Sequence, residues 1–153
     1  MHLTFAPNNI LQIDEAKIIF RNFAGVGSKF NREGDRNFSV LIEDEDVANA
    51  LADRDYNVKI KPPREEGDTP FMHLPVKVKF NERGPRVFLK TGERVNELDE
   101  ESIAVIDDID IASVDMDLRT YEWEVNGKTG RTVYLQSMHV VQEVDRFADR
   151  YNL

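Results

Sequence analysis

The sequence predicts a mainly β protein that folds as a small closed barrel with one or two short helices. Apolar and polar residues alternate in several short segments, which is the period-2 pattern of half-buried strands. Two other segments place apolar residues at helical spacing, and an Asn-Gly pair separates two alternating runs near the end of the chain. With 153 residues, of which 41% are hydrophobic, the chain suits a single domain over residues 1–153 with one core.

The first predicted strand follows an irregular start. Residues 1–12 show no periodicity and are interpreted as an irregular lead-in. Residues 16–23 alternate, which predicts a strand with Phe20 on the apolar face and Phe23 on the opposite face among basic residues. Residues 25–36 are rich in glycine and polar side chains and are expected to form a loop.

A helix and several short strands are expected in the middle of the chain. Asp44 can cap a helix that ends near Asp55, because an aspartate side chain accepts hydrogen bonds from the first helical amides. Three prolines and several charges between residues 61 and 70 predict a loop. Strands are expected before the helix and around this loop, over 37–43, 56–61, 75–80 and 86–90.

The last third of the chain predicts a short helix and a long hairpin. Residues 99–108 form the expected helix, and Asn126-Gly127 is the expected turn between two strands. The apolar pattern of the first of these strands changes phase, which we interpret as a β-bulge near Arg119 or Thr120. The second strand is expected over residues 131–142.

This order of elements favours an OB-fold-like barrel. The OB-fold places a helix directly before its last strands, as the helix at residues 99–108 would be. The helix near Asp44 would then be an insertion into a five-stranded barrel. Residues 143–153 are expected to form a C-terminal extension.

The net charge of −9 comes from one segment of the chain. Residues 95–118 hold nine acids and no base, and the remaining chain holds 20 acids and 20 bases. Salt screens charges over about 10 Å at 0.1 M, so local charge outweighs the total. A basic groove for a nucleic acid is therefore compatible with an acidic chain.

The loop over residues 25–36 carries the strongest candidate site. Its cations can contact phosphates, and its aromatic ring and amide can contact bases. An ordinary solvated loop fits the same spacing. The loop sequence GVGSK lacks the G-x-x-x-x-G-K-[ST] spacing of phosphate loops, which excludes nucleotide hydrolysis of that type. The candidate residues of the loop are Lys29, Phe30, Asn31, Arg32 and Arg36.

Further candidates lie on the predicted strands. Alternating lysines give two strands a basic outer face, which would also keep any half-exposed strand soluble. Aromatic residues of the terminal hairpin could stack on bases, although core packing is the stronger alternative for Trp123. These strand residues complete the predicted nucleic-acid-binding set: Arg21, Phe23, Lys59, Lys61, Lys77, Lys79, Tyr121, Trp123, Lys128 and Tyr134.

Other function classes find no support in the sequence. The absence of cysteine excludes disulfides and thiolate zinc sites. The three histidines lack ligand spacing and the aspartates lack the EF-hand pattern, so we predict no metal site and no cofactor. No local catalytic motif is present, and we predict a protein that is not an enzyme. No apolar stretch approaches the ~20 residues of a membrane span, and no leader opens the chain, so we expect a cytoplasmic protein.

At the basic loop and the terminal hairpin the sequence resembles a family of single-stranded DNA-binding proteins from phages and prophages. The segments that carry the resemblance are residues 19–23 (IFRNF), 31–38 (NREGDRNF), 121–130 (YEWEVNGKTG) and 134–135 (YL). The similarity extends over residues 17–142. It implies an OB-like fold and sequence-tolerant binding of single-stranded DNA during phage replication or recombination, in the cytoplasm of a bacterial host.

Two functions from different classes remain as hypotheses. The leading one is a non-catalytic single-stranded DNA-binding protein, with replication or recombination proteins and further copies of the chain as additional candidate partners. The alternative is a protein-interaction module or DNA mimic that uses the acidic surface of residues 95–118. An enzyme with a dispersed site is a third class, for which the sequence offers no positive sign.

Overall fold

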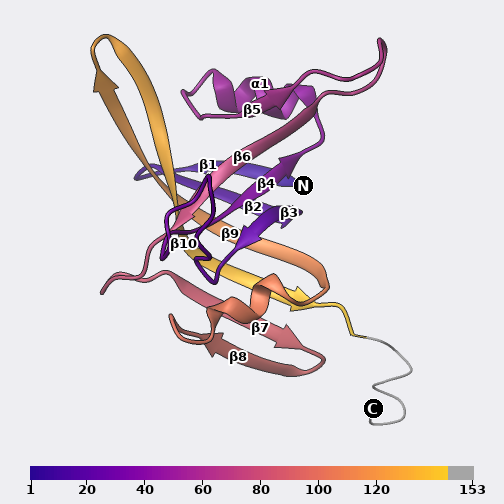
Figure 1. Cartoon of the computed structure of the whole chain (residues 1–153), viewed down its shortest axis with the longest axis vertical. Helices are drawn as coiled ribbons and strands as arrows, with labels where there is room; N and C mark the ends of the chain where they lie inside the picture. Colours follow the sequence, from indigo (N-terminus) through magenta and orange to yellow (C-terminus); the bar gives the residue numbers. More distant parts are fainter. Residues whose placement is uncertain (145–153) are drawn as a thin grey trace.

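The computed structural model describes residues 1–144, and within them the chain is mainly β. Ten strands hydrogen-bond into one sheet, accompanied by one α-helix and one 3-10 helix (Figure 1). The predicted fold class of mainly β with short helices is confirmed. In chain order the elements are β1 (His2–Ala6), β2 (Ile10–Ala16), β3 (Ile18–Asn22), β4 (Arg36–Ile42), α1 (Glu45–Ala52), β5 (Lys59–Lys61), β6 (Phe71–Val78), β7 (Arg86–Thr91), β8 (Arg94–Leu98), η1 (Ile103–Asp107), β9 (Ile111–Val125) and β10 (Lys128–Gln142).

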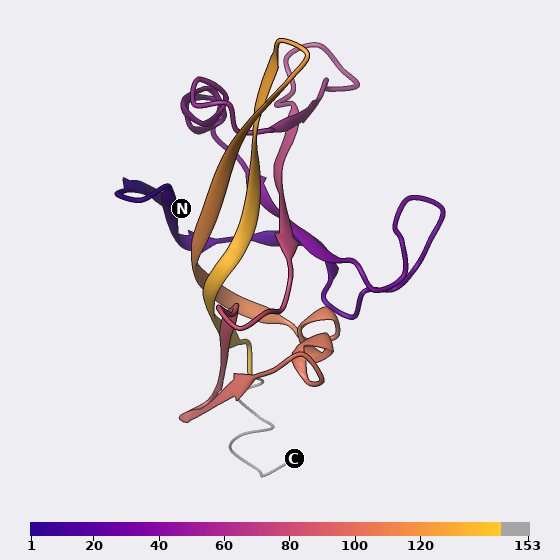
Figure 2. The same cartoon turned by 90° about the vertical axis from the view of Figure 1, so that its left-hand side faces the viewer.

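The strands follow the order β1-β2-β9-β10-β6-β4-β3. β5 joins this path at β6, and the β7–β8 hairpin joins it at β10. The two end strands, β1 and β3, do not pair with each other within residues 1–144, so the sheet is open and the predicted closed barrel is not confirmed. The β9–β10 hairpin runs along much of the long axis and projects beyond the other strands (Figures 1 and 2).

The first twelve residues form a hairpin in place of the predicted irregular lead-in. β1 pairs antiparallel with β2 over its full length. The connecting turn holds Asn8 and Asn9 at φ 65° and 60°, a left-handed conformation that asparagine tolerates. No side chain of β1 is fully buried, so its sequence lacks the alternation that identifies a strand.

The first helix confirms the predicted cap at Asp44. α1 begins after Asp44, whose side chain accepts a hydrogen bond from the Asp46 amide at 2.8 Å. The predicted helix over 99–108 is shorter, since only η1 is helical, and the Asp99 carboxylate caps the turn before it by accepting the Ser102 amide at 2.9 Å. No helix within residues 1–144 is both long enough and apolar enough to cross a membrane.

The strands around β6 differ in length from their predictions. The strand expected over 56–61 is reduced to β5, because Tyr56 turns into the core beside β10. β6 starts at Phe71, four residues earlier than expected. β8 was not predicted, because only Leu98 among its residues is buried.

The terminal hairpin confirms the predicted turn and corrects the predicted bulge. Asn126 and Gly127 occupy the turn with positive φ, as this pair favours. The alternation of buried residues in β9 runs without a break to Thr120, and the two register shifts of the hairpin lie between Leu135 and Ser137 and between Val141 and Gln142. The apparent change of phase after Leu118 arises because the hairpin leaves the core there, so its aromatic residues need not face inward.

Candidate nucleic-acid interface

The outer face of β6 gathers aromatic and basic side chains. Every second residue from Met72 to Val78 is buried, so the residues between them face outward. These outward residues are Phe71, His73, Pro75 and Lys77. Strand pairing places Lys61 of β5 beside Phe71 and Lys59 beside His73. The outer face of β6 connects two hollows, one toward each end of the strand.

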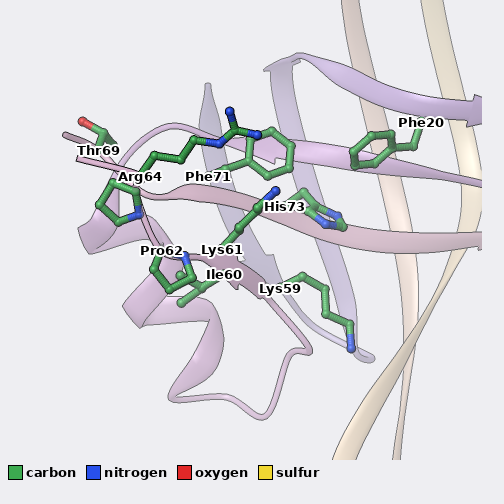
Figure 3. Close-up of a pocket in the computed structure, with 10 residues that line it drawn as sticks. Phe20, Lys59, Ile60, Lys61, Pro62, Arg64, Thr69, Phe71 and His73 are labelled. Atoms are coloured by element: carbon green, nitrogen blue, oxygen red, sulfur yellow. The ribbon is translucent and has the colours of Figure 1, made fainter. Parts of the chain in front are cut away.

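The first hollow, which we call the β5–β6 pocket, has a volume of about 540 Å³. Its walls come from β3, β5, β6 and the loop that joins β5 to β6. Figure 3 shows the rings of Phe71, His73 and Phe20 following one another across this pocket. The ring of Phe20 lies 6.0 Å from that of Phe71 and 5.2 Å from that of His73, both in edge-to-face geometry.

Phe20 reaches this pocket through an unusual backbone. Its φ is 51°, a left-handed value that costs an aromatic residue of the order of 1–2 kcal/mol. The β3–β4 register shifts between Ile19 and Asn22, and the bulge turns Phe20 away from the core. Its side chain is 62% exposed. Strained residues of this kind cluster at functional sites, where the surrounding structure holds them in place.

His73 is held in the pocket as a neutral ring. Burial and the neighbouring Lys59 ammonium lower the pKa of His73 below its usual 6.5. Nδ1 of the ring is 2.9 Å from the hydroxyl of Ser39, which is buried on β4. At neutral pH the imidazole is therefore uncharged and offers a flat surface beside the two phenylalanine rings.

The cations of the β5–β6 pocket are not neutralised by neighbouring acids. Lys59, Lys61 and Arg64 line it, and no aspartate or glutamate does. Within residues 1–144 none of the three forms an ion pair with a carboxylate. The pocket thus combines flat apolar walls with positive charge, which suits a ligand that has a planar ring and negative charge.

The second hollow, which we call the loop groove, has a volume of about 620 Å³. It lies between the loop over residues 25–35 and the far end of β6. Lys77 of β6, Lys79 just after the end of β6, and Arg32 of the loop line it. Tyr134 of β10 closes its other side, where strand pairing sets it beside Lys77.

The projecting hairpin continues this surface with aromatic rings. Tyr134 packs edge to face on Tyr121 with ring centres 5.7 Å apart. Trp123 is 45% exposed, which excludes the core position considered from the sequence. Its indole covers Gly130, where any side chain would collide with the ring at 2.3 Å. Arg119, Tyr121 and Trp123 alternate along β9 on the side of Tyr134, so they extend the same face.

The structure brings most of the predicted binding residues onto this connected surface. The lysines of β5 line the first hollow, Lys77 of β6 and Lys79 just after it line the second, and the aromatic residues lie on the hairpin. Lys128 is exposed near the hairpin tip. Lys29 and Phe30 lie at the loop tip with the cation 5.8 Å from the ring, and Phe30 is 93% exposed.

Two predicted residues of β3 and its end have other roles. Phe23 is fully buried and stacks on Phe38 with ring centres 5.1 Å apart, so its assignment to a binding surface is wrong. The guanidinium of Arg21 donates to the carbonyls of Ile106 and Ile109, each at 2.7 Å. Arg21 therefore ties β3 to η1 and is not directed at a ligand.

Two predicted residues of the loop hold the loop itself together. The Asn31 amide donates to the carbonyls of Val26 and Asp35, at 2.9 and 3.0 Å, and so fixes the loop shape. Arg36 donates to the Phe23 carbonyl at 2.9 Å and pairs with Glu100 at 3.2 Å. Both residues line the loop groove, but their side chains already make contacts within the fold, so their part in binding a nucleic acid stays a prediction.

The sequence did not identify Phe20, Arg64, Phe71 or His73 as site residues. Alternation placed Phe20 on the core face, but the bulge in β3 reverses the direction of its side chain. Phe71 and His73 precede the expected start of the strand at residue 75, so their alternation with Met72 and Leu74 went unused. That alternation is the signal that could have found them.

The acidic segment over residues 95–118 is largely engaged within the fold. Hydrogen bonds hold the pKa of Glu97, through Arg86, and that of Asp99, through Ser102, below their usual values. The Asp107 carboxylate accepts the amides of Phe23 and Ala24 at 2.8 and 2.9 Å. Five of the nine acids make hydrogen bonds or ion pairs within the fold: Glu97, Asp99, Glu100, Asp107 and Asp115. This arrangement does not favour a phosphate-like surface.

The sequence of the chain was compared with known protein families. Residues 3–153 match the protein family described as "Putative phage ssDNA-binding domain". The chain belongs to this phage ssDNA-binding domain family. No curated protein matches its sequence.

Solved structures show that the fold of this phage ssDNA-binding domain also occurs in bacteriophage Enc34. The single-stranded DNA-binding protein of that phage is 12% identical, with a TM-score of 0.56 over 95% of this chain and 87% of that one. Its C-terminal truncation is 14% identical, with a TM-score of 0.54 over 91% and 88%. Its complex with ssDNA is 13% identical, with a TM-score of 0.52 over 95% and 93%.

Proposed function

We propose that this chain is a non-catalytic single-stranded DNA-binding protein, formed by a single OB-like domain, that acts in phage DNA replication or recombination in the cytoplasm of a bacterial host. The observation that carries the proposal is the outer face of β6, which joins the β5–β6 pocket to the loop groove. Family membership and the likeness to a phage protein solved with ssDNA support it.

The surface fits a single strand better than a duplex. From Phe71 to Lys77 the strand extends about 20 Å at ~3.3 Å per residue, which can accommodate several nucleotides. Exposed rings stand at both ends of this track, and they can stack only on bases that a duplex would keep paired. The lysines contact phosphates, which are the same for every sequence, so binding should show little sequence preference.

Fluorescence anisotropy with labelled oligo-dT and a duplex of equal length, at several salt concentrations, tests the proposal. We expect tighter binding of the single strand and an affinity that falls as salt rises. Equal affinity for both forms, or no binding to either at low salt, would contradict it. Self-association on the strand and contacts with replication or recombination proteins remain predictions, which sedimentation with and without oligo-dT would begin to test.

A further inference from the structure

The β5–β6 pocket has features that a uniform phosphate track does not require. A lysine-lined strand needs no cavity and no strained residue to hold a polyanion. Here Phe20 is kept at φ 51° by a bulge, with its ring against His73 and near Phe71. The cost of this backbone is retained although the ring remains largely exposed, so core packing does not explain it.

From this geometry we infer that the β5–β6 pocket takes one unstacked nucleobase, with its flanking phosphates on Lys59, Lys61 and Arg64, and so anchors a single nucleotide of the bound strand. The inference rests on the proposed function, and it adds that one position of the strand is held differently from the others. The pocket volume of about 540 Å³ lies within the range of small-ligand sites, roughly 300–1,000 Å³.

The chemistry of the walls supports a base over other ligands. Phe20 and Phe71 present exposed ring surface, and His73 is uncharged at neutral pH, so the three side chains offer flat surfaces without an opposing charge. The cations surround these surfaces, and acids are absent from the lining. A nucleotide has a planar base and a negative phosphate a few ångströms apart, which matches this arrangement of surfaces and charges.

The strained backbone at Phe20 leads to a prediction about the melting temperature. Glycine adopts positive φ without strain, so Phe20→Gly relieves the backbone while it removes the ring. We expect the melting temperature of this variant to be unchanged or raised, whereas binding that depends on bases weakens. A Phe20 that served only to stabilise the fold would instead lower the melting temperature when removed and leave DNA binding intact.

The deciding experiment compares oligo-dT with an abasic strand of equal length, which keeps the phosphates and lacks the bases. For the wild-type chain we expect a strong preference for oligo-dT. In Phe20→Gly/Phe71→Ala the preference should fall by about 5- to 160-fold, since one stacked base contributes roughly that factor. The salt dependence should stay unchanged, because the three cations remain. Phe5→Ala, an exposed ring on β1 outside the proposed surface, is the matched control and should keep the full preference.

Each outcome decides the inference. If the double variant keeps the wild-type preference for oligo-dT, the pocket does not hold a base, even though the protein binds single strands. If the wild-type chain binds neither strand, the proposed function fails and the inference fails with it. A third outcome uses an acidic peptide that contains phenylalanine. If this peptide binds the wild-type chain but not the double variant, and does not displace oligo-dT from the wild-type chain, the pocket belongs to a protein partner and the inference is overturned.

Discussion

The loop over residues 25–35 and the β5–β6 pocket contain the same kinds of residues in different settings. Both hold cations and phenylalanine, and the loop concentrates them within a short stretch of sequence. In the loop, Phe30 stands alone at the tip, 93% exposed, and Arg32 faces Asp35 at 3.6 Å. In the pocket, residues from three strands and a loop converge, and their rings contact one another.

The difference teaches that a cluster of suitable residue types forms a site only where contacts within the fold leave the side chains free to meet a ligand. Hydrogen bonds within the loop occupy Asn31, and Arg36 pairs with Glu100. Nine of the ten pocket residues lie within residues 59–73, and Phe20 joins them from β3. Within residues 1–144 no acid pairs with their cations. We therefore rank the pocket above the loop in its contribution to DNA binding, and the following predictions test this ranking in order of expected effect.

The largest effect is expected from removing the pocket cations. Lys59→Ala/Lys61→Ala/Arg64→Ala should reduce the salt slope on single strands by roughly 0.7 per lost contact, and the affinity by up to about 100-fold at 0.1 M salt. Anisotropy titrations with oligo-dT measure both quantities. The control Lys90→Ala/Arg94→Ala, on the β7–β8 hairpin, should leave them nearly unchanged. An equal loss in this control would show that total charge, and not the pocket, determines binding.

A smaller effect is expected from the loop tip. Lys29→Ala/Arg32→Ala removes at most two phosphate contacts, so the slope should fall by about 1.4 or less, and the affinity by up to about 25-fold at 0.1 M salt. The same titrations apply. If this variant loses more affinity than the pocket variant, the ranking is reversed.

Arg36 separates stability from binding. Its side chain is 21% exposed and bonds to the Phe23 carbonyl and to Glu100, so Arg36→Ala should lower the free energy of unfolding by roughly 1–3 kcal/mol. Urea denaturation measures this loss, and Lys29→Ala should show less than ~0.5 kcal/mol. A stable Arg36→Ala with weakened DNA binding would show that Arg36 binds DNA directly from the wall of the loop groove.

The smallest effect concerns pH. The pKa of His73 lies below 6.5 in the free protein, so its ring gains a proton only as pH falls below that value. A nearby phosphate favours the charged ring, and affinity for oligo-dT should therefore rise as pH falls below 6.5, by at most about tenfold per pH unit. The fold should become less stable over the same range, because the unfolded chain binds the proton more readily. His73→Gln should weaken both dependences, and an unchanged pH profile for binding would remove His73 from the site.

Sequence patterns predicted strands with one buried face, and they predicted turns and caps that depend on particular residue types. β4, the Asn126-Gly127 turn and the cap at Asp44 follow from alternation, turn preference and side-chain capping. β1 and β8 escaped because few of their residues are buried, and an edge strand without an inner face has no alternation to detect.

The sequence predicted the lysines of the site but did not predict the aromatic rings of the pocket. Lysines on alternate positions show their outer face directly, as Lys59 and Lys77 do. Phe20 could not be placed, because a one-residue shift in strand register reverses the direction of every side chain that follows. The same shift put Phe23 in the core, where alternation had placed it outside.

Photocrosslinking tests the central claim most directly, because it shows which residues touch the bound strand. Oligo-dT with photoreactive bases is bound to the full chain at low salt and irradiated, and the modified peptides are identified by mass spectrometry. The account predicts crosslinks on the outer face of β6, at Phe71 or His73, together with Phe20 and the hairpin rings Tyr121 and Trp123. Crosslinks confined to the β7–β8 hairpin or to the acidic segment over residues 95–118 would contradict it.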